Sequence, residues 1–448
     1  MEIKEHILMK ILVWSHTLMS TGGRTMLANL LSTLAKEPEI TSLHAVLAHP
    51  LDYEVLTDII KPNAKLKLSC SINEAAHISS NFGQKCLEEC DLVYFNWPHV
   101  LPNMMNLERV NKPSVCTFQD TTVWDFGLYH YDALNHSWIE TQKFLKNIDQ
   151  IVVASNYIKE RLALMLDTEE TNHINIVKHY YVSKEILKAK NKPSLPLPPR
   201  YIVCPTNIES HKNIVNLLLA WCQFKTRTEL PLVFFGSGTD QLAYQVPEWS
   251  PGIPQITSLV YRKGLKPHRD FFPLGLIRDE EVIPIIKNAE ALIMPTLAEG
   301  GGSYPVEEAI ALKIPVLCSS IPPIVEQLEG REVKSVLFFD PENPVDILGA
   351  LNYFVEHYEP IKAIASAHEY TYTDSWDQAA KNYLTIFKKA LKSKPKEIKT
   401  ATAFPAAENQ ANNKEKRLEL YCNNESDMPA ILNQIFQNVI PKTKNMVN

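Results

Sequence analysis

Residues 295–308 combine a glycine cluster with carboxylates at a spacing that suits a phosphorylated sugar. They read Pro-Thr-Leu-Ala-Glu-Gly-Gly-Gly-Ser-Tyr-Pro-Val-Glu-Glu, and three of the chain's 14 glycines stand side by side here. Glycine lets the backbone approach a ligand closely, and amides at the start of a following helix suit phosphate. Glu299, with Glu307 or Glu308, brackets the loop, and carboxylates suit sugar or ribose hydroxyls. Taken alone, the loop is equally consistent with an ordinary tight connection.

Apolar runs on either side of this loop predict a strand before it, over 291–294, and a helix after it, over 307–312. The same alternation recurs through the second half of the chain. Further strands are predicted at 201–204, 232–235, 271–274 and 315–318, and further helices at 214–224, 279–288 and 344–358.

The first half of the chain alternates in the same way. Strands are predicted at 10–14, 43–47, 92–95, 114–118 and 150–154, and helices at 25–36, 137–147 and 157–166, with Gly22 and Gly23 in the turn before the first helix. Strands that are apolar along their length and separated by helices predict parallel sheets covered on both faces.

Four prolines between residues 193 and 199 separate the two halves and predict a stiff linker. The predicted fold is therefore α/β, with two tandem Rossmann-like domains, residues 1–195 and 196–374, facing a cleft. An amphipathic helix is predicted at 376–391. Residues 393–448 are polar and lysine-rich, which predicts a disordered linker with a weak helix at 428–439.

Composition excludes several classes of function. The net charge of −6 offers no basic field for nucleic acid, so no nucleic-acid partner is predicted. No apolar run approaches the roughly 18 residues that span a bilayer, and Met1 to Trp14 is a poor signal peptide. The eight cysteines are scattered without metal-site spacing, which favours a reducing, cytoplasmic location and predicts no metal site.

The segment 271–340 resembles the retaining glycosyltransferases of the GT-B fold, family 4 (glycosyl transferases group 1). The resemblance rests on the glycine loop, on Pro-Val-Glu-Glu-Ala after it, and on His211-Lys212-Asn213, which is similar to the family's lysine motif. Thr21-Gly22-Gly23-Arg24 and Trp376 fit the same pattern. The resemblance implies that 196–374 binds the donor, that 1–195 lies on the acceptor side, and that 375–392 crosses back to the N-terminal domain.

The resemblance also implies a role for individual residues. Lys212 would contact the donor diphosphate, Glu299 would hold sugar hydroxyls, and Glu308 would bind the ribose. The backbone amides of Gly300, Gly301, Gly302 and Ser303 would hold phosphate, and Gly22 and Gly23 would approach from the opposite side. The catalytic residues expected on this basis are Glu299, Lys212 and Asp120.

Three positions depart from the family's pattern. The Pro-x-x-Glu-Ala register places the second glutamate at Glu308, one residue further from Glu299 than usual, whereas Glu307 keeps the usual spacing. Asn207, expected among the donor-binding residues, stands where many relatives have an arginine, so one phosphate charge partner is either missing or supplied elsewhere, by Arg24 or Arg278. Gln119-Asp120 stands where relatives often have His-Asp.

The expected function is transfer of a sugar from a nucleoside-diphosphate donor to an acceptor hydroxyl, with retention of configuration and without a metal or other cofactor. The acceptor would be a glycan, a lipid-linked molecule or a protein. A lysine run at 388–399 is a candidate contact with anionic membranes, although such runs also form solvated helix ends. The alternatives are a sugar-nucleotide-binding protein with a degenerate site and a GT-B epimerase.

Overall fold

The computed structural model describes most of the chain up to residue 393. The described residues are 7–15, 21–71, 78–96, 110–126, 131–179, 182, 184–225, 228–243, 253–371 and 375–393. The predicted disorder after residue 393 and the predicted helix at 428–439 lie outside them. No helix within these ranges is long and apolar enough to cross a membrane.

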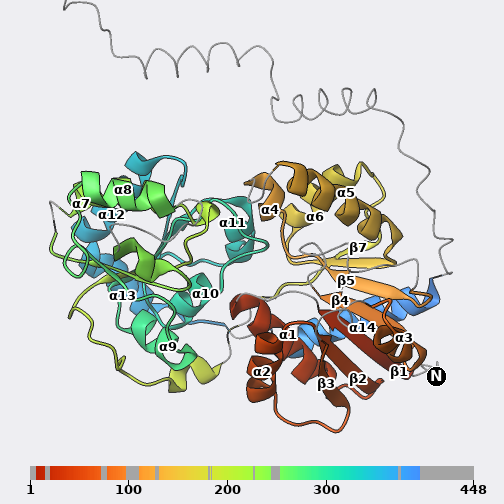
Figure 1. Cartoon of the computed structure of the whole chain (residues 1–448). Helices are drawn as coiled ribbons and strands as arrows, with labels where there is room; N and C mark the ends of the chain where they lie inside the picture. The colour runs from red at the N-terminus through yellow and green to blue at the C-terminus, as the bar shows by residue number, and fades with distance from the viewer. Residues whose placement is uncertain are drawn as a thin grey trace, which may run out of the picture. The chain divides into compact units, whose positions relative to one another are not determined.

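The first half of the chain forms a seven-stranded parallel sheet in the order β3-β2-β1-β4-β5-β6-β7 (Figure 1). The order reverses between β1 and β4, which marks this as a doubly wound sheet. The strands are β1 (Met9–Ser15), β2 (Ile40–Leu47), β3 (Leu66–Cys70), β4 (Leu92–Asn96), β5 (Ser114–Thr117), β6 (Gln150–Val153) and β7 (Ile174–Ile176).

Helices cover both faces of this sheet, as its continuously apolar strands require. One face packs against α1 (Thr21–Leu34), α2 (Pro50–Ile59) and α14 (Trp376–Lys392). The other face packs against α3 (Asn81–Glu88), α5 (Tyr131–Asn147) and α6 (Asn156–Leu166). The short helix α4 (Thr122–Asp125) follows β5.

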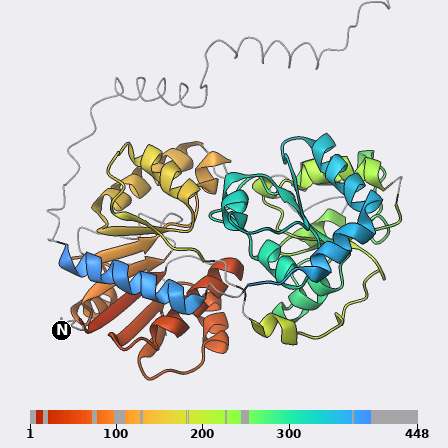
Figure 2. The same cartoon turned by 180° about the vertical axis from the view of Figure 1, so that it is seen from behind.

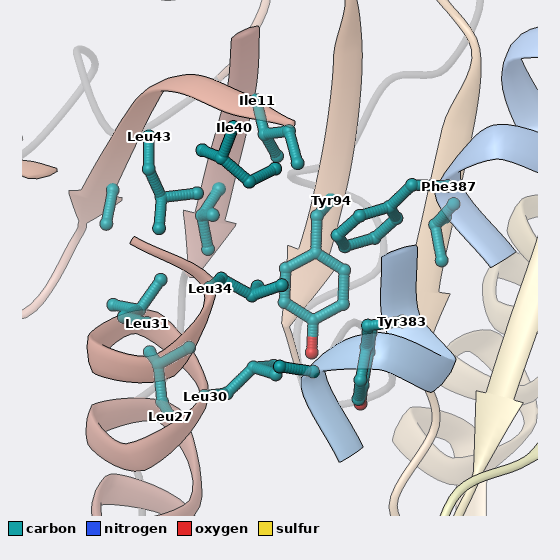
Figure 3. Packing of buried hydrophobic residues seen from close by; sticks show 14 of the residues in the cluster. Ile11, Leu27, Leu30, Leu31, Leu34, Ile40, Leu43, Tyr94, Tyr383 and Phe387 are labelled. Atoms are coloured by element: carbon teal, nitrogen blue, oxygen red, sulfur yellow. The ribbon is translucent and has the colours of Figure 1, made fainter. Parts of the chain in front are cut away.

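Helix α14 comes last among the described elements, yet it completes the core of the first sheet. Figure 3 shows Tyr383 and Phe387 of α14 beside Tyr94 of β4 and the leucines of α1. The Tyr383 hydroxyl lies 2.7 Å from the Thr117 hydroxyl and 2.9 Å from Nε2 of His179. The Thr117 hydroxyl in turn lies 2.6 Å from that of Tyr94. Burial lowers the pKa of His179 to about 3, so its ring is neutral.

The second half forms a six-stranded parallel sheet in the order β10-β9-β8-β11-β12-β13. Figure 2 shows the strands and helices of this half in green to blue, seen from behind. The order reverses between β8 and β11, which repeats the doubly wound plan of the first half. The strands are β8 (Ile202–Pro205), β9 (Leu232–Phe235), β10 (Phe271–Pro273), β11 (Ala291–Met294), β12 (Val316–Ser319) and β13 (Val336–Phe339).

Two groups of helices cover the second sheet. One face packs against α7 (Ile214–Phe224), α8 (Ile253–Arg262), α12 (Pro344–Glu356) and α13 (Tyr358–Ala367). The other packs against α9 (Asp279–Lys287), α10 (Tyr304–Ala311) and α11 (Pro322–Leu328). Short 3₁₀ turns occur at Lys184–Lys188 (η4), Ser210–Lys212 (η5) and Thr239–Ala243 (η6).

The predicted α/β class is confirmed, and β9, β11 and α7 occupy the predicted residues. Some predictions were incomplete. The sequence had predicted neither the edge strands β3, β7 and β13 nor the helices α2, α3, α4, α8, α11 and α13 (Tyr358–Ala367). Gly22 and Gly23 lie in the first turn of α1 and not in a turn before it. Packing against the sheet stabilises a helix more than the propensity of single residues does, so two glycines do not prevent this turn from being helical.

Replacing Tyr383 with phenylalanine tests the buried hydrogen bonds that link the Tyr383 hydroxyl to Thr117 and His179. The variant keeps the ring packing but removes the hydroxyl that bonds to Thr117 and His179, so two buried polar groups lose a partner. We expect the free energy of unfolding to fall by about 1–3 kcal/mol, measured by urea denaturation. Lys381→Ala, on the exposed side of the same helix, is the control and should change it little. Equal free energies of unfolding for the wild type and Tyr383→Phe would show that these hydrogen bonds contribute nothing to stability.

Candidate active site

The candidate site lies at the reversal point of the second sheet. Strands β8 and β11 are neighbours, and they run parallel with Ala291 beside Ile202. The loops that follow their carboxyl ends therefore emerge side by side. In doubly wound sheets this position is the usual place for a ligand. One loop carries Lys212 and the other carries Glu299 and the glycine cluster.

The loop after β8 is shaped by Asn213. This residue has a left-handed backbone (φ 61°) and ends the η5 turn just before α7. Its buried side-chain amide donates to the carbonyl oxygens of Pro295 at 2.9 Å and Pro341 at 2.7 Å. Asparagine tolerates this backbone conformation better than most residues. Asn213 thereby joins the ends of β11 and β13 and holds the neighbouring Lys212 in place.

Lys212 and Glu299 form an ion pair at the reversal point. Lys212 Nζ lies 2.7 Å from Glu299 Oε1, and the two side chains are 18% and 16% exposed. Each of the two loops thus contributes one charge to a shielded pair that solvent still reaches. An ammonium group beside a carboxylate offers one group to phosphate oxygens and the other to hydroxyl hydrogens.

The glycine loop presents amide groups that have no internal acceptor. Within the described residues, the amides of Gly300, Gly301 and Gly302 donate to no protein atom. Gly301 and Gly302 are nevertheless buried. Because buried N–H groups are nearly always hydrogen-bonded, these donors call for solvent or a ligand. They can bind an anion beside Lys212.

Two positions in this loop require glycine. A Cβ on Gly300 would lie 2.3 Å from the backbone oxygen of Gln119, so the loop approaches the segment after β5 too closely for a side chain. Gly302 has φ +131°, and its Cβ would lie 2.3 Å from Oε1 of Gln327. Side chains are therefore sterically excluded at both the first and the last glycine of the run.

The Ser303 amide, which was expected to hold phosphate, has an acceptor within the protein. The N–H of Ser303 donates to Gln327 Oε1 at 2.6 Å, and Gln327 Nε2 returns a bond to the Ser303 carbonyl at 3.1 Å. This amide is therefore already engaged, and the free donors are those of the three glycines.

The two adjacent glutamates of α10 have opposite environments. Glu307 is 2% exposed and accepts hydrogen bonds from Arg331, from Gln327 at 3.0 Å and from the Tyr370 hydroxyl at 2.8 Å. Glu308 is partly exposed, and its carboxylate has no partner within the described residues. Desolvation raises the pKa of Glu308 to about 7. Glu307 thus supports the structure, whereas Glu308 is free to bind.

Two sequence-predicted residues of the first half, Gly22 and Asp120, lie near α10 or the glycine loop. A Cβ on Gly22 would lie 3.7 Å from the ring of Tyr304, the first residue of α10, and Gly23 is buried next to it in α1. A Cβ on Gly300 would lie 3.3 Å from Cβ of Asp120. Asp120 Oδ1 also accepts from the Thr122 amide at 3.0 Å, which fixes the start of α4.

Both arginines considered as substitutes at Asn207 have carboxylate partners elsewhere. Nε of Arg24 lies 2.8 Å from Oδ1 of the buried Asp52. Arg278 lies 3.0 Å from Glu280 and 3.6 Å from Glu281, and is 71% exposed. The Asn207 side chain accepts from the Glu209 amide at 3.1 Å, as in a turn. Of the three cations considered, Lys212 is the one that pairs with a residue of the glycine loop, Glu299.

Sequence reasoning missed His211 as a part of the site. Its Nδ1 is buried without a hydrogen-bond partner in the described part of the chain, and its ring lies 6.1 Å from that of Phe126. Burial and then the charge of Lys212 lower its pKa to about 4, against the opposing effect of Asp120. Its place directly before Lys212 was the available signal.

The lysine run at the end of α14 is partly engaged within the protein. Lys388 lies 3.0 Å from Glu39, and Lys389 donates to the Asn172 carbonyl. The run's lysines beyond residue 393 lie outside the described residues. No cluster of three or more His, Cys, Asp or Glu side chains suited to a metal occurs in the part that the structure describes.

Solved structures with the same arrangement define the fold class. The Anabaena protein HepE, in complex with UDP and glucose, matches with a TM-score of 0.57 and 13% identity, covering 85% of this chain and 97% of that one. A glycosyltransferase from Rickettsia africae matches with a TM-score of 0.55 and 13% identity, covering 86% of this chain and 100% of that one. Sucrose-phosphate synthase from Thermosynechococcus elongatus matches with a TM-score of 0.55 and 14% identity, covering 92% and 100%. The chain has the two-domain, GT-B-like fold of these proteins.

A comparison with protein families finds a match for the second half of the chain. Residues 185–370 match the family described as Glycosyl transferases group 1. The matched span contains the whole second sheet, and with it Lys212, Glu299 and Glu308. It covers less than half of the chain, and the first sheet is outside it. None of the curated proteins matches the chain.

The raised pKa of Glu308 gives a prediction about stability. The folded state binds a proton more tightly than the unfolded chain, because the ionised carboxylate is desolvated. The protonated Glu308 therefore adds to the free energy of unfolding at pH values below the pKa of the unfolded chain. That stabilisation is lost as the pH rises through the pKa of the folded protein, about 7. The wild type should therefore lose stability relative to Glu308→Gln between pH 5 and pH 8, measured by urea denaturation of both proteins. If the difference in free energy of unfolding between the wild type and Glu308→Gln does not change with pH, the raised pKa of Glu308 is contradicted.

Proposed function

We propose that this chain is a retaining, metal-independent glycosyltransferase of family 4 that moves a sugar from a nucleoside-diphosphate donor to an acceptor hydroxyl. One observation supports this most strongly. Three glycine amides that have no acceptor in the described part of the chain lie in the same loop as Glu299, whose carboxylate pairs with Lys212. Such a set provides for a diphosphate and a sugar at once. The group 1 match over the same residues agrees with it.

Each group has one task in the proposed reaction. The bond between the anomeric carbon and the diphosphate oxygen breaks, and Lys212 with the glycine amides stabilises the charge on the leaving diphosphate. The acceptor hydroxyl forms the new bond on the same face of the sugar, and its proton passes to a phosphate oxygen. Glu299 orients the sugar hydroxyls, and Glu308 accepts hydrogen bonds from the ribose. Catalysis is then mainly positioning and charge stabilisation.

The donor diphosphate has to compete with Glu299 for Lys212. In the pair, the carboxylate already neutralises the ammonium group, so binding must exchange one anion for another. Sugar hydroxyls can occupy the carboxylate as it releases Lys212, which couples diphosphate binding to sugar binding. Asp120, which lies beside Gly300, is placed to contact the donor sugar or the acceptor hydroxyl.

A ligand panel and a transfer assay test the proposal. UDP-, GDP-, ADP- and TDP-sugars are screened by thermal shift, starting with UDP-glucose because the structure of HepE was solved with it. We expect one nucleotide to raise the melting temperature and its sugar to be transferred or slowly hydrolysed. Stabilisation without turnover would favour a binding protein, and interconversion of the donor would favour an epimerase. Absence of any stabilisation would overturn the proposal.

Two substitutions separate the tasks of the ion pair. Lys212→Ala removes a charged hydrogen bond to the diphosphate, so the affinity for the free nucleoside diphosphate should fall by roughly 10- to 100-fold. Glu299→Gln releases Lys212 without removing it, so that affinity should be unchanged or higher. Transfer by Glu299→Gln should nevertheless fall by about 100-fold or more, as when a group that contacts the reacting centre is lost. Calorimetry and initial rates measure the two effects.

The control for these variants is Lys334→Ala. Lys334 is 74% exposed and lies 4.0 Å from the exposed Glu332, so its loss removes a charge without touching the site. Both affinity and rate should stay at wild-type values. Equal loss of nucleoside-diphosphate affinity in Glu299→Gln and Lys212→Ala would mean that the pair acts only as a structural link.

A further inference from the structure

Helix α11 places two adjacent side chains on two different parts of the molecule. The carboxylate of Glu326 accepts from the backbone amides of Asn156 at 2.6 Å and Tyr157 at 3.2 Å. These amides open α6, which covers the first sheet. A carboxylate at a helix N-terminus satisfies donors that have no partner within the helix and interacts favourably with the helix dipole. Glu326 therefore fastens the second half of the chain to α6.

The next residue, Gln327, holds the end of the glycine loop. It is 6% exposed and bonds to both the amide and the carbonyl of Ser303. Its Nε2 also donates to Glu307 at 3.0 Å, which ties the loop to α10. The space opposite Gly302 is filled by its Oε1. The backbone conformation after the free glycine amides is thus set by one side chain of α11.

The start of α6 touches the loop directly as well. The Ser155 hydroxyl donates to the carbonyl oxygen of Gly300 at 2.9 Å and accepts from the Ile158 amide at 3.2 Å. Ser155 is the N-cap of α6, so one residue both starts this helix and orients the first glycine of the cluster. Separating α6 from α11 would break the two bonds to Glu326 and the bond to Gly300 together.

We propose that Glu326 and Gln327 are positioning residues that couple the docking of α6 to the shape of the donor-binding loop. When α6 is docked, Glu326 fixes α11, and Gln327 on the same helix fixes Ser303 and the glycine amides before it. The nucleotide donor then meets amides that are already arranged. This inference rests on the proposed function, since it names how the same site is shaped by the other half of the chain.

A graded series at Glu326 tests the coupling. UDP, GDP, ADP and TDP are titrated into the wild type and into Glu326→Gln, Glu326→Ala and Glu326→Lys by calorimetry. For the nucleotide that binds the wild type, the affinity should fall about 3-fold, 10-fold and more than 10-fold in that order. Glutamine keeps one acceptor oxygen, and lysine places a positive charge at the helix N-terminus. In the transfer reaction, the donor KM should rise more than kcat falls.

Gln327→Met and a double variant locate the effect in α11. Methionine is similar in length but cannot bond to Ser303, so the nucleotide affinity should again fall about 10-fold. In Gln327→Met with Glu326→Ala, the loss should be smaller than the product of the single losses, because both act through the same loop. Hydrogen exchange of peptides over 299–304 should rise in Glu326→Ala, although that substitution leaves the loop's own contacts intact.

The outcomes distinguish this inference from the proposed function. If the wild type binds none of the nucleotides, the proposed function fails, and hydrogen exchange still decides the coupling. If the wild type binds but the Glu326 variants bind equally well with unchanged exchange at 299–304, the coupling is wrong. Multiplicative losses in the double variant also overturn it. Glu329→Ala, an exposed residue at the end of α11, is the control and should match the wild type in affinity and exchange.

Discussion

Both halves of this protein depend on one constraint, that a parallel sheet must be covered by helices on both of its faces. Within the described residues most strands are therefore followed by a helix, and the loops between strand and helix emerge at the carboxyl edge of the sheet. Where the strand order reverses, two such loops have no helix between them. In the second half these loops are the ones after β8 and β11. Lys212 and Glu299 are 87 residues apart in the sequence. They meet because β8 and β11, whose carboxyl ends lead into their loops, are neighbours in the sheet.

The fold was predictable from the sequence wherever an element is buried on both sides. Strands such as β9 and β11 are continuously apolar, and α7 presents an apolar stripe that begins next to Asn213. The missed strands β3, β7 and β13 lie at or next to sheet edges, where exposure weakens the apolar signal. Helix α11 is only seven residues long and opens with two prolines, so its periodicity is too short to detect.

The candidate site was predictable in its residues but not in its contacts. The glycine cluster, Lys212 and the two glutamates stand out because together they match the pattern of a known family, whereas the loop alone is equally consistent with an ordinary tight connection. The engagement of Glu307 could not be predicted, because its partners Arg331, Gln327 and Tyr370 come from later elements. The engagement of Ser303 escaped prediction for the same reason. Local sequence shows which groups are present, whereas the fold decides which of them already have a partner.

The position of α14 has a consequence for the order in which the protein can fold. Ala379, Tyr383 and Phe387 are fully buried in the core of the first sheet, yet they are joined to it only after the whole second half has been synthesised. A ribosome that has released the first seven strands has released a domain with one face covered only in part, by α1 and α2. Until residue 387 emerges, the rings of Tyr94 and its neighbours have no cover from α14. The second half can complete its own sheet earlier, so the N-terminal domain, although made first, is the last to be closed.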